Sequence, residues 1–502
     1  MGRLTKRDFL TSASAVGALG VCQGSAGAAS AKAASKPQGL PNGMDGVALA
    51  SAIRKREMSP KEAVDEAIAR VEAVEPKLNA IVSAYFEEAR EIASSNAYEN
   101  GPFAGVPTFI KDLYDWKGHR TGEGSRAFDK AAPATDDGVF PSSWRSAGMI
   151  SLGKSSSPEF GALPSSQPLS SGPTRNPWDL SRDASGSSSG AAALVAARVV
   201  PFAHASDGGG SIRTPATTCG VFGLKPTRDR LPVANGPARD FALSVSHAET
   251  ITVRDSVALF QIAEGDFSGG RLGDVKPLDR PLRIGLMTEA PLGTPVDPNV
   301  VTAIKETATL CENLGHKVEP FKHSFDISQY GDDFILLWAA GSAEGAQYAS
   351  KASGKPIGPD ILEPWTLGLV QLFQQRKEEF PAAYERLKAF QQVYEDDLAG
   401  IDVLLSPVTG RPATPLGELA PTVDFELLYE RIFSFSAFTT PQNTAGAASM
   451  SVPLGMSPDG LPIGSLFSGT YGDDGLLFSL ALQLEEAKNW HNDVPPVNAL
   501  QV

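Results

Sequence analysis

Two runs of small residues in the middle of the chain combine hydroxyl groups with backbone that can turn tightly. The first run, residues 185–190, leads into an alanine-rich segment, and the second, residues 206–213, holds three consecutive glycines before Ser211. Such glycines let the chain turn with its N–H groups exposed, as in an oxyanion hole. A serine after that turn is placed to attack a carbonyl whose developing negative charge the N–H groups bind. A flexible Ser/Gly linker is the alternative, but apolar segments follow both runs, so we expect them inside a core.

A serine nucleophile also needs a base that accepts its proton. The chain has six histidines in no recognisable motif, and each fits a surface or packing position better than a catalytic one. Lysine can serve instead if burial and nearby positive groups lower its pKa from about 10.4. Lys111 follows the apolar run 105–110, so it stands at the carboxyl end of a predicted buried strand. It is therefore the candidate base, and a solvated loop lysine is the alternative.

The surroundings of these residues resemble the amidase signature family of Ser–cis-Ser–Lys hydrolases. Residues 207–216 are similar to the core signature of that family, and residues 219–227 are similar to its continuation. The likeness runs from about residue 45 to 485, with shorter matches in the segments 105–112, 153–160, 176–178, 405–407 and 441–453. At Gly208 the chain departs from the isoleucine common in the family, and this resembles a bacterial subgroup that includes cyclic-oligoamide hydrolases.

The resemblance implies roles for three side chains. Ser211 matches the nucleophile that forms the acyl-enzyme, and Ser187 matches a bridging serine whose preceding peptide bond is cis. Lys111 matches the lysine that, when neutral, draws the proton of Ser211 through Ser187. The implied reaction is hydrolysis of the C–N bond of a linear or cyclic carboxamide, without a metal ion or an organic cofactor.

The resemblance also implies how the loop around the nucleophile is held. It assigns the oxyanion hole to three backbone N–H groups, those of Gly208, Gly209 and Gly210. Asp207 and Arg213 are expected to pair and to fix the backbone of this loop. Ser188 is expected to be a supporting hydroxyl beside the three catalytic side chains.

Two other functions stay open on the sequence. Residues 186–190 match the Gly-x-Ser-x-Gly pattern of α/β-hydrolases, which would make Ser188 the nucleophile of an esterase. That pattern needs a strand directly before it, whereas residues 178–183 are polar and irregular. An exported solute-binding protein also fits the size and charge, but it leaves Lys111 and the two serines without a purpose.

Alternating helix and strand patterns must position these residues. Ser59 begins a strong helix with Pro60 and Glu62 in its first turn, and the apolar spacing continues until Pro76. Other predicted helices cover 80–93, 191–200, 297–314 and a segment from 474, and predicted strands cover 105–110, 283–287, 318–321 and 401–405. The alternation predicts an α/β/α sandwich with a large, mixed and mostly parallel central sheet covered by helices.

One large domain is expected over residues 42–500, because no repeat and no linker interrupts it. Within it, residues 228–280 and 316–400 carry no readable pattern and are expected to be variable regions of the substrate pocket. Residues 1–35 instead resemble an export signal of the bacterial twin-arginine type. They combine a basic head, which includes Lys6 and Arg7, with a weakly apolar stretch and small residues. The expected location is the periplasm.

The composition argues against nucleic acid as a partner and against two classes of protein, disulfide scaffolds and membrane-spanning proteins. The formal net charge is −14 and there is no long basic run, which argues against nucleic-acid binding. Three cysteines exclude a disulfide scaffold. No segment beyond the first 35 residues approaches the ~20 apolar residues of a membrane span, so none is expected. The expected partner is a small-molecule amide, and a homodimer is left open.

Overall fold

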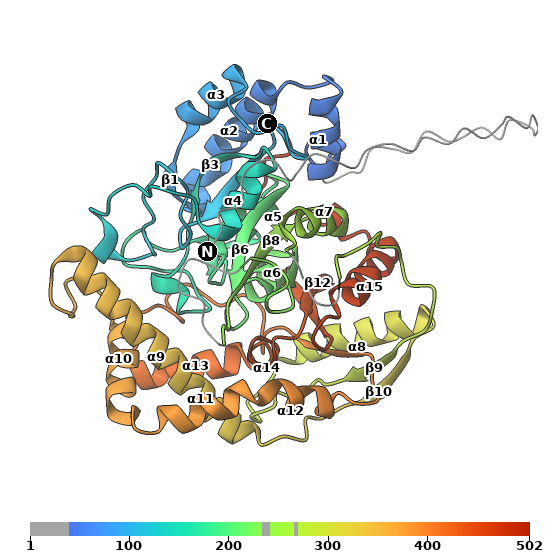
Figure 1. The fold of residues 1–502 in the computed structure, drawn as a ribbon. Coiled ribbons are helices and arrows are strands. Elements are labelled where there is room, and N and C mark those ends of the chain that lie inside the picture. The colour runs from blue at the N-terminus through green and yellow to red at the C-terminus, as the bar shows by residue number, and fades with distance from the viewer. Residues whose placement is uncertain (1–39, 233–240, 266–269) are drawn as a thin grey trace, which may run out of the picture. The chain divides into compact units, whose positions relative to one another are not determined.

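The computed structural model describes residues 40–232, 241–265 and 270–502 of the protein. The segment predicted to be an export signal, residues 1–35, lies outside the described residues. From Leu40 onward, the described residues group into one compact α/β unit in which helices flank the strands (Figure 1). No helix in these ranges is long and apolar enough to cross a membrane.

A sheet of eight strands runs through this unit. In order across the sheet, its strands are β10 (Lys317–Pro320), β9 (Arg283–Leu286), β11 (Val403–Pro407), β13 (Pro462–Ser468), β12 (Ser449–Met456), β7 (Phe222–Lys225), β8 (Val245–Thr250) and β6 (Phe202–Asp207). β9 pairs in parallel with β10 and with β11, and the other five neighbouring pairs are antiparallel. The large mixed sheet was predicted correctly, but the expectation that it is mostly parallel is wrong. A short turn between sequential strands gives an antiparallel pair, and residues 457–461 join β12 to β13 in this way.

A second sheet of three strands carries Lys111. Its strands in order are β1 (Ile81–Ala84), β3 (Ile150–Ser155) and β2 (Pro107–Lys111). β2 is parallel to β3, and every residue of β2 is buried. The Thr108 hydroxyl donates to the Phe202 carbonyl at 3.1 Å, which ties β2 to β6 of the large sheet. The predicted buried strand therefore exists, and Lys111 is its last residue.

Local sequence signals place the start of α2 (Pro60–Leu78) correctly. Ser59 accepts a hydrogen bond from the Glu62 N–H at 3.2 Å, and the Glu62 carboxylate accepts one from the Ser59 N–H at 2.8 Å. The predicted helix over residues 80–93 is wrong in its first part, where β1 pairs with β3. The helix there, α3 (Phe86–Ser95), begins only after that strand.

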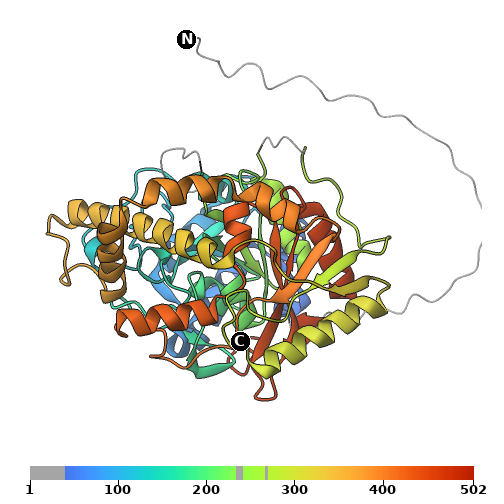
Figure 2. The same cartoon turned by 90° about the horizontal axis from the view of Figure 1, so that it is seen from below.

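The other helices pack around the two sheets. They are α1 (Gly46–Arg54), α4 (Val139–Ser146), α5 (Ser189–Ala196), α6 (Arg213–Cys219), α7 (Val253–Ala263), α8 (Pro298–Asn313), α9 (Ile327–Ser353), α10 (Pro364–Arg376), α11 (Phe380–Lys388), α12 (Phe390–Asp397), α13 (Phe425–Phe435), α14 (Thr440–Ala445) and α15 (Asp474–Ala487). One apolar cluster joins the large sheet to α7, α8 and α15, and another joins β6 to α2, α5 and α6. α9, α10, α11 and α13 form a group beside the strands (Figure 1), and Figure 2 shows the same group in yellow to orange.

Candidate active site

Lys111 is completely buried, and three serine hydroxyls surround its amino group. Its Nζ atom lies 2.7 Å from the Oγ atom of Ser187, 2.9 Å from that of Ser188 and 3.1 Å from that of Ser206. The structure thus brings together Lys111, Ser187 and Ser188, three of the residues that the sequence predicts to lie in the site. Ser206 was not selected, although its place directly before Asp207 in the second run was a usable signal.

The surroundings of Lys111 favour its neutral form. Burial lowers the pKa of Lys111 to about 7, because the charged amino group loses its contact with water. The negative charges of Asp207 and Glu249 act in the opposite direction but are outweighed. A substantial share of Lys111 is therefore uncharged near neutral pH and able to accept a proton.

The backbone before Ser187 is shaped to present its hydroxyl to Lys111. The peptide bond between Gly186 and Ser187 is cis, as the resemblance implied. The Gly186 N–H donates to the Pro164 carbonyl at 2.9 Å. A Cβ atom at position 186 would lie 2.9 Å from the Leu163 carbonyl oxygen, so the close approach of these two segments favours glycine.

Asp207 organises the loop of residues 207–213, which we call the glycine loop. Its carboxylate accepts hydrogen bonds from the Gly210 N–H at 2.7 Å and from the Ile212 N–H at 3.1 Å. It also pairs with the Arg213 guanidinium at 2.9 Å, and both side chains are fully buried. Burial alone would raise the pKa of Asp207, but Arg213 and the Asn443 amide hold it below its usual value. The expected pairing of Asp207 with Arg213 is present.

The direction of the Gly210 N–H corrects one part of the predicted oxyanion hole. This N–H points to Asp207, while the Gly209 carbonyl accepts a hydrogen bond from the Thr439 hydroxyl at 2.6 Å. Both polar groups of the peptide unit between Gly209 and Gly210 are therefore hydrogen-bonded, and its N–H is not available to a substrate. Among the described residues, the N–H groups of Gly208, Gly209 and Ser211 have no acceptor. These three groups, rather than that of Gly210, are free to bind an oxyanion.

α14 closes the glycine loop from the opposite side. The Asn443 amide donates to the Asp207 carbonyl oxygen at 3.0 Å and to its carboxylate at 2.9 Å. The Arg213 guanidinium donates to the side-chain oxygens of Asn443 at 2.7 Å and Gln442 at 3.1 Å. Asn443 belongs to the matched motifs, but its role in holding Asp207 and Arg213 was not predicted.

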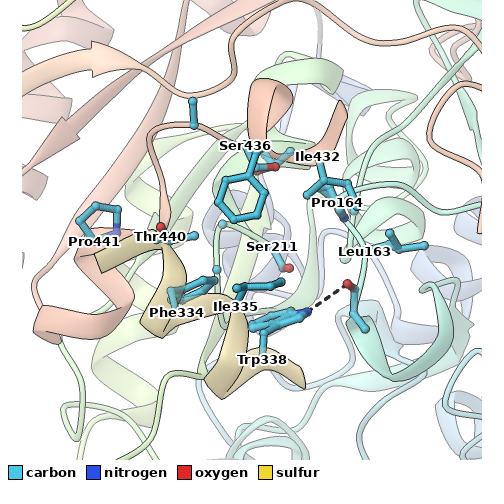
Figure 3. Close-up of a pocket in the computed structure, with 18 of the residues that line it drawn as sticks. Leu163, Pro164, Ser211, Phe334, Ile335, Trp338, Ile432, Ser436, Thr440 and Pro441 are labelled. Carbon is cyan, nitrogen blue, oxygen red and sulfur yellow. Dashed lines mark hydrogen bonds between the residues drawn. The ribbon is translucent and has the colours of Figure 1, made fainter. Parts of the chain in front are cut away.

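Ser211 faces a solvent-open pocket with a volume of about 880 Å³, which includes the open space at its mouth. Gly209, Gly210 and Ser211 form part of its lining, and apolar side chains supply most of the rest (Figure 3). No Asp, Glu, Lys, Arg or His side chain of the described residues lines it. Exposure falls from 8% at Ser211 to 2% at Ser187 and 0% at Lys111, and of this trio only Ser211 lines the pocket.

The alternative nucleophile, Ser188, is in the wrong place. Its side chain is fully buried, contacts Lys111 and donates to the Ser206 carbonyl at 3.2 Å, and it does not line the pocket. A short strand, β5 (Asp179–Asp183), does precede the first run, where an irregular segment was expected. β5 ends at Asp183, three residues before the cis bond that precedes Ser187. Ser188 therefore does not sit on the sharp strand-to-helix turn that exposes the nucleophile in an α/β-hydrolase.

No group of three or more His, Cys, Asp or Glu side chains in the described part of the chain is arranged to hold a metal ion. His204 lies closest in sequence to the glycine loop, and its Nδ1 accepts the backbone N–H of Lys111 at 3.3 Å. Burial keeps the pKa of His204 well below its usual value. It therefore serves as a neutral packing residue behind Lys111.

A family model described as "Amidase" matches residues 62–478. The chain belongs to the amidase family. "Putative amidase AmiC" of Mycobacterium tuberculosis (strain ATCC 25618 / H37Rv) is 38% identical over 452 residues, which cover 89% of this chain and 95% of that protein. "6-aminohexanoate-cyclic-dimer hydrolase" of Paenarthrobacter ureafaciens is 34% identical over 477 residues, covering 89% and 95% of the two chains.

A solved structure of 6-aminohexanoate cyclic dimer hydrolase complexed with substrate has the same fold. It matches with a TM-score of 0.82 and 32% identity, over 90% of this chain and 99% of that one. This amidase is accordingly an enzyme that hydrolyses amide C–N bonds, and the alternatives of an esterase of the α/β-hydrolase type and of a solute-binding protein are wrong.

Proposed function

We propose that Ser211 is the nucleophile of this amidase, that Lys111 is its base and that Ser187 carries the proton between them. The observation that carries this proposal is a fully buried Lys111 amino group 2.7 Å from the Ser187 hydroxyl, beneath a pocket that exposes Ser211. A backbone hydrogen bond also holds the two serine-containing runs together at this site, because the Ser188 N–H donates to the Ser211 carbonyl at 3.2 Å.

The reaction begins with a proton transfer and ends with the same groups in their starting state. Neutral Lys111 takes the Ser187 proton while Ser187 takes that of Ser211, and the Ser211 oxygen bonds to the amide carbon. The free N–H groups of the glycine loop bind the resulting oxyanion. When the C–N bond breaks, Ser187 gives its proton to the leaving amine and takes one back from Lys111, which becomes neutral again. Water then attacks the acyl-enzyme by the same proton route and releases the acid.

The pocket supports an uncharged carboxamide as the substrate. A charged group would lose its hydration in an apolar pocket without an opposite charge to pair with. The relative named a 6-aminohexanoate-cyclic-dimer hydrolase acts, by its name, on a cyclic compound, and a cyclic amide is compatible with this pocket. We propose uncharged amides, linear or cyclic, as the substrate class.

Replacement of the nucleophile tests the mechanism. S211A should lower kcat by about 10³-fold or more while the unfolding curve stays the same, because the trio acts as a unit. K111A should cost nearly as much. S142A, which removes an exposed hydroxyl on α4, is the matched control and should keep wild-type activity. An S211A protein that still hydrolyses amides at the wild-type rate would disprove the assignment. Covalent labelling by a fluorophosphonate, mapped by mass spectrometry to the peptide that holds Ser211, is an independent check.

We also propose that residues 1–35 direct the enzyme to the periplasm. The support is the sequence pattern of a basic head, a weakly apolar stretch and small residues. An exported amidase would meet small amides that enter the periplasm rather than cytosolic partners.

A further inference from the structure

One wall of the substrate pocket comes from the region 316–400, which none of the matched motifs covers. α9 and α10 supply Phe334, Trp338 and Trp365 to this wall, and we call these three side chains the aromatic wall. No described residue of the other variable region, 228–280, lines the pocket. Figure 3 shows Phe334 and Trp338 on one side of Ser211 and Ile432 on the other. A group bound beside Ser211 therefore lies between α13 and the aromatic wall.

Trp338 faces both Gly208 and Gly209 of the glycine loop, and Phe334 also reaches Gly209, where its Cζ atom would lie 3.5 Å from an added Cβ atom. A Cβ atom added at Gly208 or at Gly209 would lie 3.6 Å from the six-membered ring of Trp338. On the neighbouring turn of α9, the Phe334 ring stacks on that of Trp338 with a centroid distance of 5.7 Å and an angle of 23°. The two parallel rings extend the flat apolar surface from the glycine loop into the pocket.

Hydrogen bonds fix the orientation of this surface. The indole N–H groups of Trp338 and Trp365 both donate to the Ala162 carbonyl, at 3.2 Å and 3.1 Å. Two helices are thus tied to one backbone oxygen, and neither N–H is available to a substrate. The next residue, Leu163, is the one whose carbonyl packs against Gly186. The aromatic wall is therefore positioned relative to the segment that presents Ser187.

We propose that Trp338 makes this enzyme selective for carboxamides whose acyl group is flat, apolar and uncharged, such as aromatic carboxamides. The inference rests on the proposed function, which places the scissile carbonyl at Ser211. The leaving amine must receive its proton from Ser187, and neither Ser187 nor Lys111 lines the pocket. The acyl group is therefore the part of the substrate that occupies the pocket and lies along the ring of Trp338.

Binding to the inactive enzyme tests the pocket separately from the chemistry. Benzamide and cyclohexanecarboxamide have rings of similar size, but only benzamide is flat. Calorimetry on S211A should give a lower Kd for benzamide by about tenfold, within the range that one hydrophobic contact can discriminate. The S211A/W338A protein should lose most of this preference. An equal Kd for both amides in S211A, or an unchanged preference after the loss of Trp338, would overturn the inference even if S211A behaves as the proposed function requires.

Turnover by the active enzyme tests whether the contact acts on the acyl side. The kcat/KM ratio of benzamide to cyclohexanecarboxamide should fall at least about fivefold in W338A and less in W338F, which keeps a flat ring. The ratio of acetanilide to N-cyclohexylacetamide, which differ only in the amine, should stay the same. If only the amine ratio changes, the pocket holds the leaving group and the inference is wrong. It is also wrong if the enzyme hydrolyses aliphatic amides but not benzamide.

A matched control separates the loss of Trp338 from the loss of any buried tryptophan. Trp490 is also buried, and its N–H donates to the Ile251 carbonyl at 2.9 Å, but it does not line the pocket. W490F should therefore leave both ratios unchanged. If W490F shifts the acyl ratio as much as W338A does, the effect is a general loss of packing and the inference fails.

Discussion

At the scale of single residues, Lys111 has to lose its charge before it can accept a proton. Its pKa is lowered to about 7 by burial, so the neutral base becomes the major form only as the pH rises through that value. We expect kcat/KM to increase with pH along a limb with its midpoint near 7. At about pH 6 the rate should be roughly a tenth of the plateau, because the neutral fraction falls to that level.

A pH profile of kcat/KM, with tryptophan fluorescence recorded in the same buffers to verify folding, checks this prediction. A midpoint near the ordinary lysine value of ~10.4 would mean that water reaches the Lys111 amino group. If the residual kcat/KM of K111A still rises with pH around the same midpoint, the titrating group is a residue other than Lys111.

The ion pair between Asp207 and Arg213 makes a prediction about stability instead of rate. D207N would leave the Arg213 charge buried without its partner, which typically costs ~3–5 kcal/mol. The free energy of unfolding, measured with urea, should fall by about that amount. Asp332 and Arg376 form a more exposed pair on α9 and α10, so D332N should cost about 1 kcal/mol or less. Equal losses in the two variants would contradict the role given to the buried pair.

The sequence proposed Lys111, Ser187 and Ser211 as the catalytic residues through a resemblance, and the same resemblance implied the cis bond before Ser187, which the structure contains. It did not reveal that the Gly210 N–H is already used. That outcome depends on Asp207, three residues before Gly210, and on Thr439, which lies 230 residues from the carbonyl it holds. A glycine run shows that the backbone can turn, whereas the direction of each N–H depends on distant partners.

At the scale of elements, α14 positions the glycine loop through the residue just before it. The Thr439 hydroxyl holds the Gly209 carbonyl, and the free N–H groups on either side of this peptide unit take their direction from it. T439V keeps the shape of the side chain but removes this bond. We expect kcat to fall about tenfold, or ~1.4 kcal/mol, because the oxyanion donors are no longer held in line.

Steady-state kinetics of two variants distinguish this positioning role from a loss of packing. T439V should change kcat much more than KM, since the N–H groups act on the transition state. T439S restores the hydroxyl and should return kcat to near the wild-type value. A T439S enzyme as slow as T439V would show that the methyl group, not the hydrogen bond, matters.

Elements with strong local signals were predictable, and elements made by distant pairing were not. The capping box at Ser59 and the apolar run that ends at Lys111 each placed their element correctly. The helix predicted over 80–93 failed because β1 is defined by its pairing with β3, about 70 residues further along the chain. Pro76 was expected to end α2, but the helix continues to Leu78.

At the scale of the whole molecule, alternating elements indicated the α/β class but not the direction of the strands. Three parallel strands, β10, β9 and β11, stand at one end of the large sheet, and the strands next to the glycine loop are antiparallel. Direction depends on which strands become neighbours, and this is settled by packing across the entire chain. β6 carries Asp207 at the edge of this sheet, beside the small sheet that carries Lys111. The proposed active site therefore lies where the two sheets meet.

The compact unit formed by the residues from Leu40 onward should work without the proposed export signal. We expect a protein that lacks residues 1–35 to keep the Tm and the kcat/KM of the full chain, because the trio, the glycine loop and the aromatic wall all lie within that unit.

In a bacterium with a twin-arginine pathway, the full chain should appear as amidase activity in the periplasmic fraction. Replacing Lys6 and Arg7 with glutamine should retain that activity in the cytosol, since this pathway recognises the basic pair. Periplasmic activity that survives the replacement would disprove the twin-arginine route, and cytosolic retention of the unaltered chain would disprove export itself.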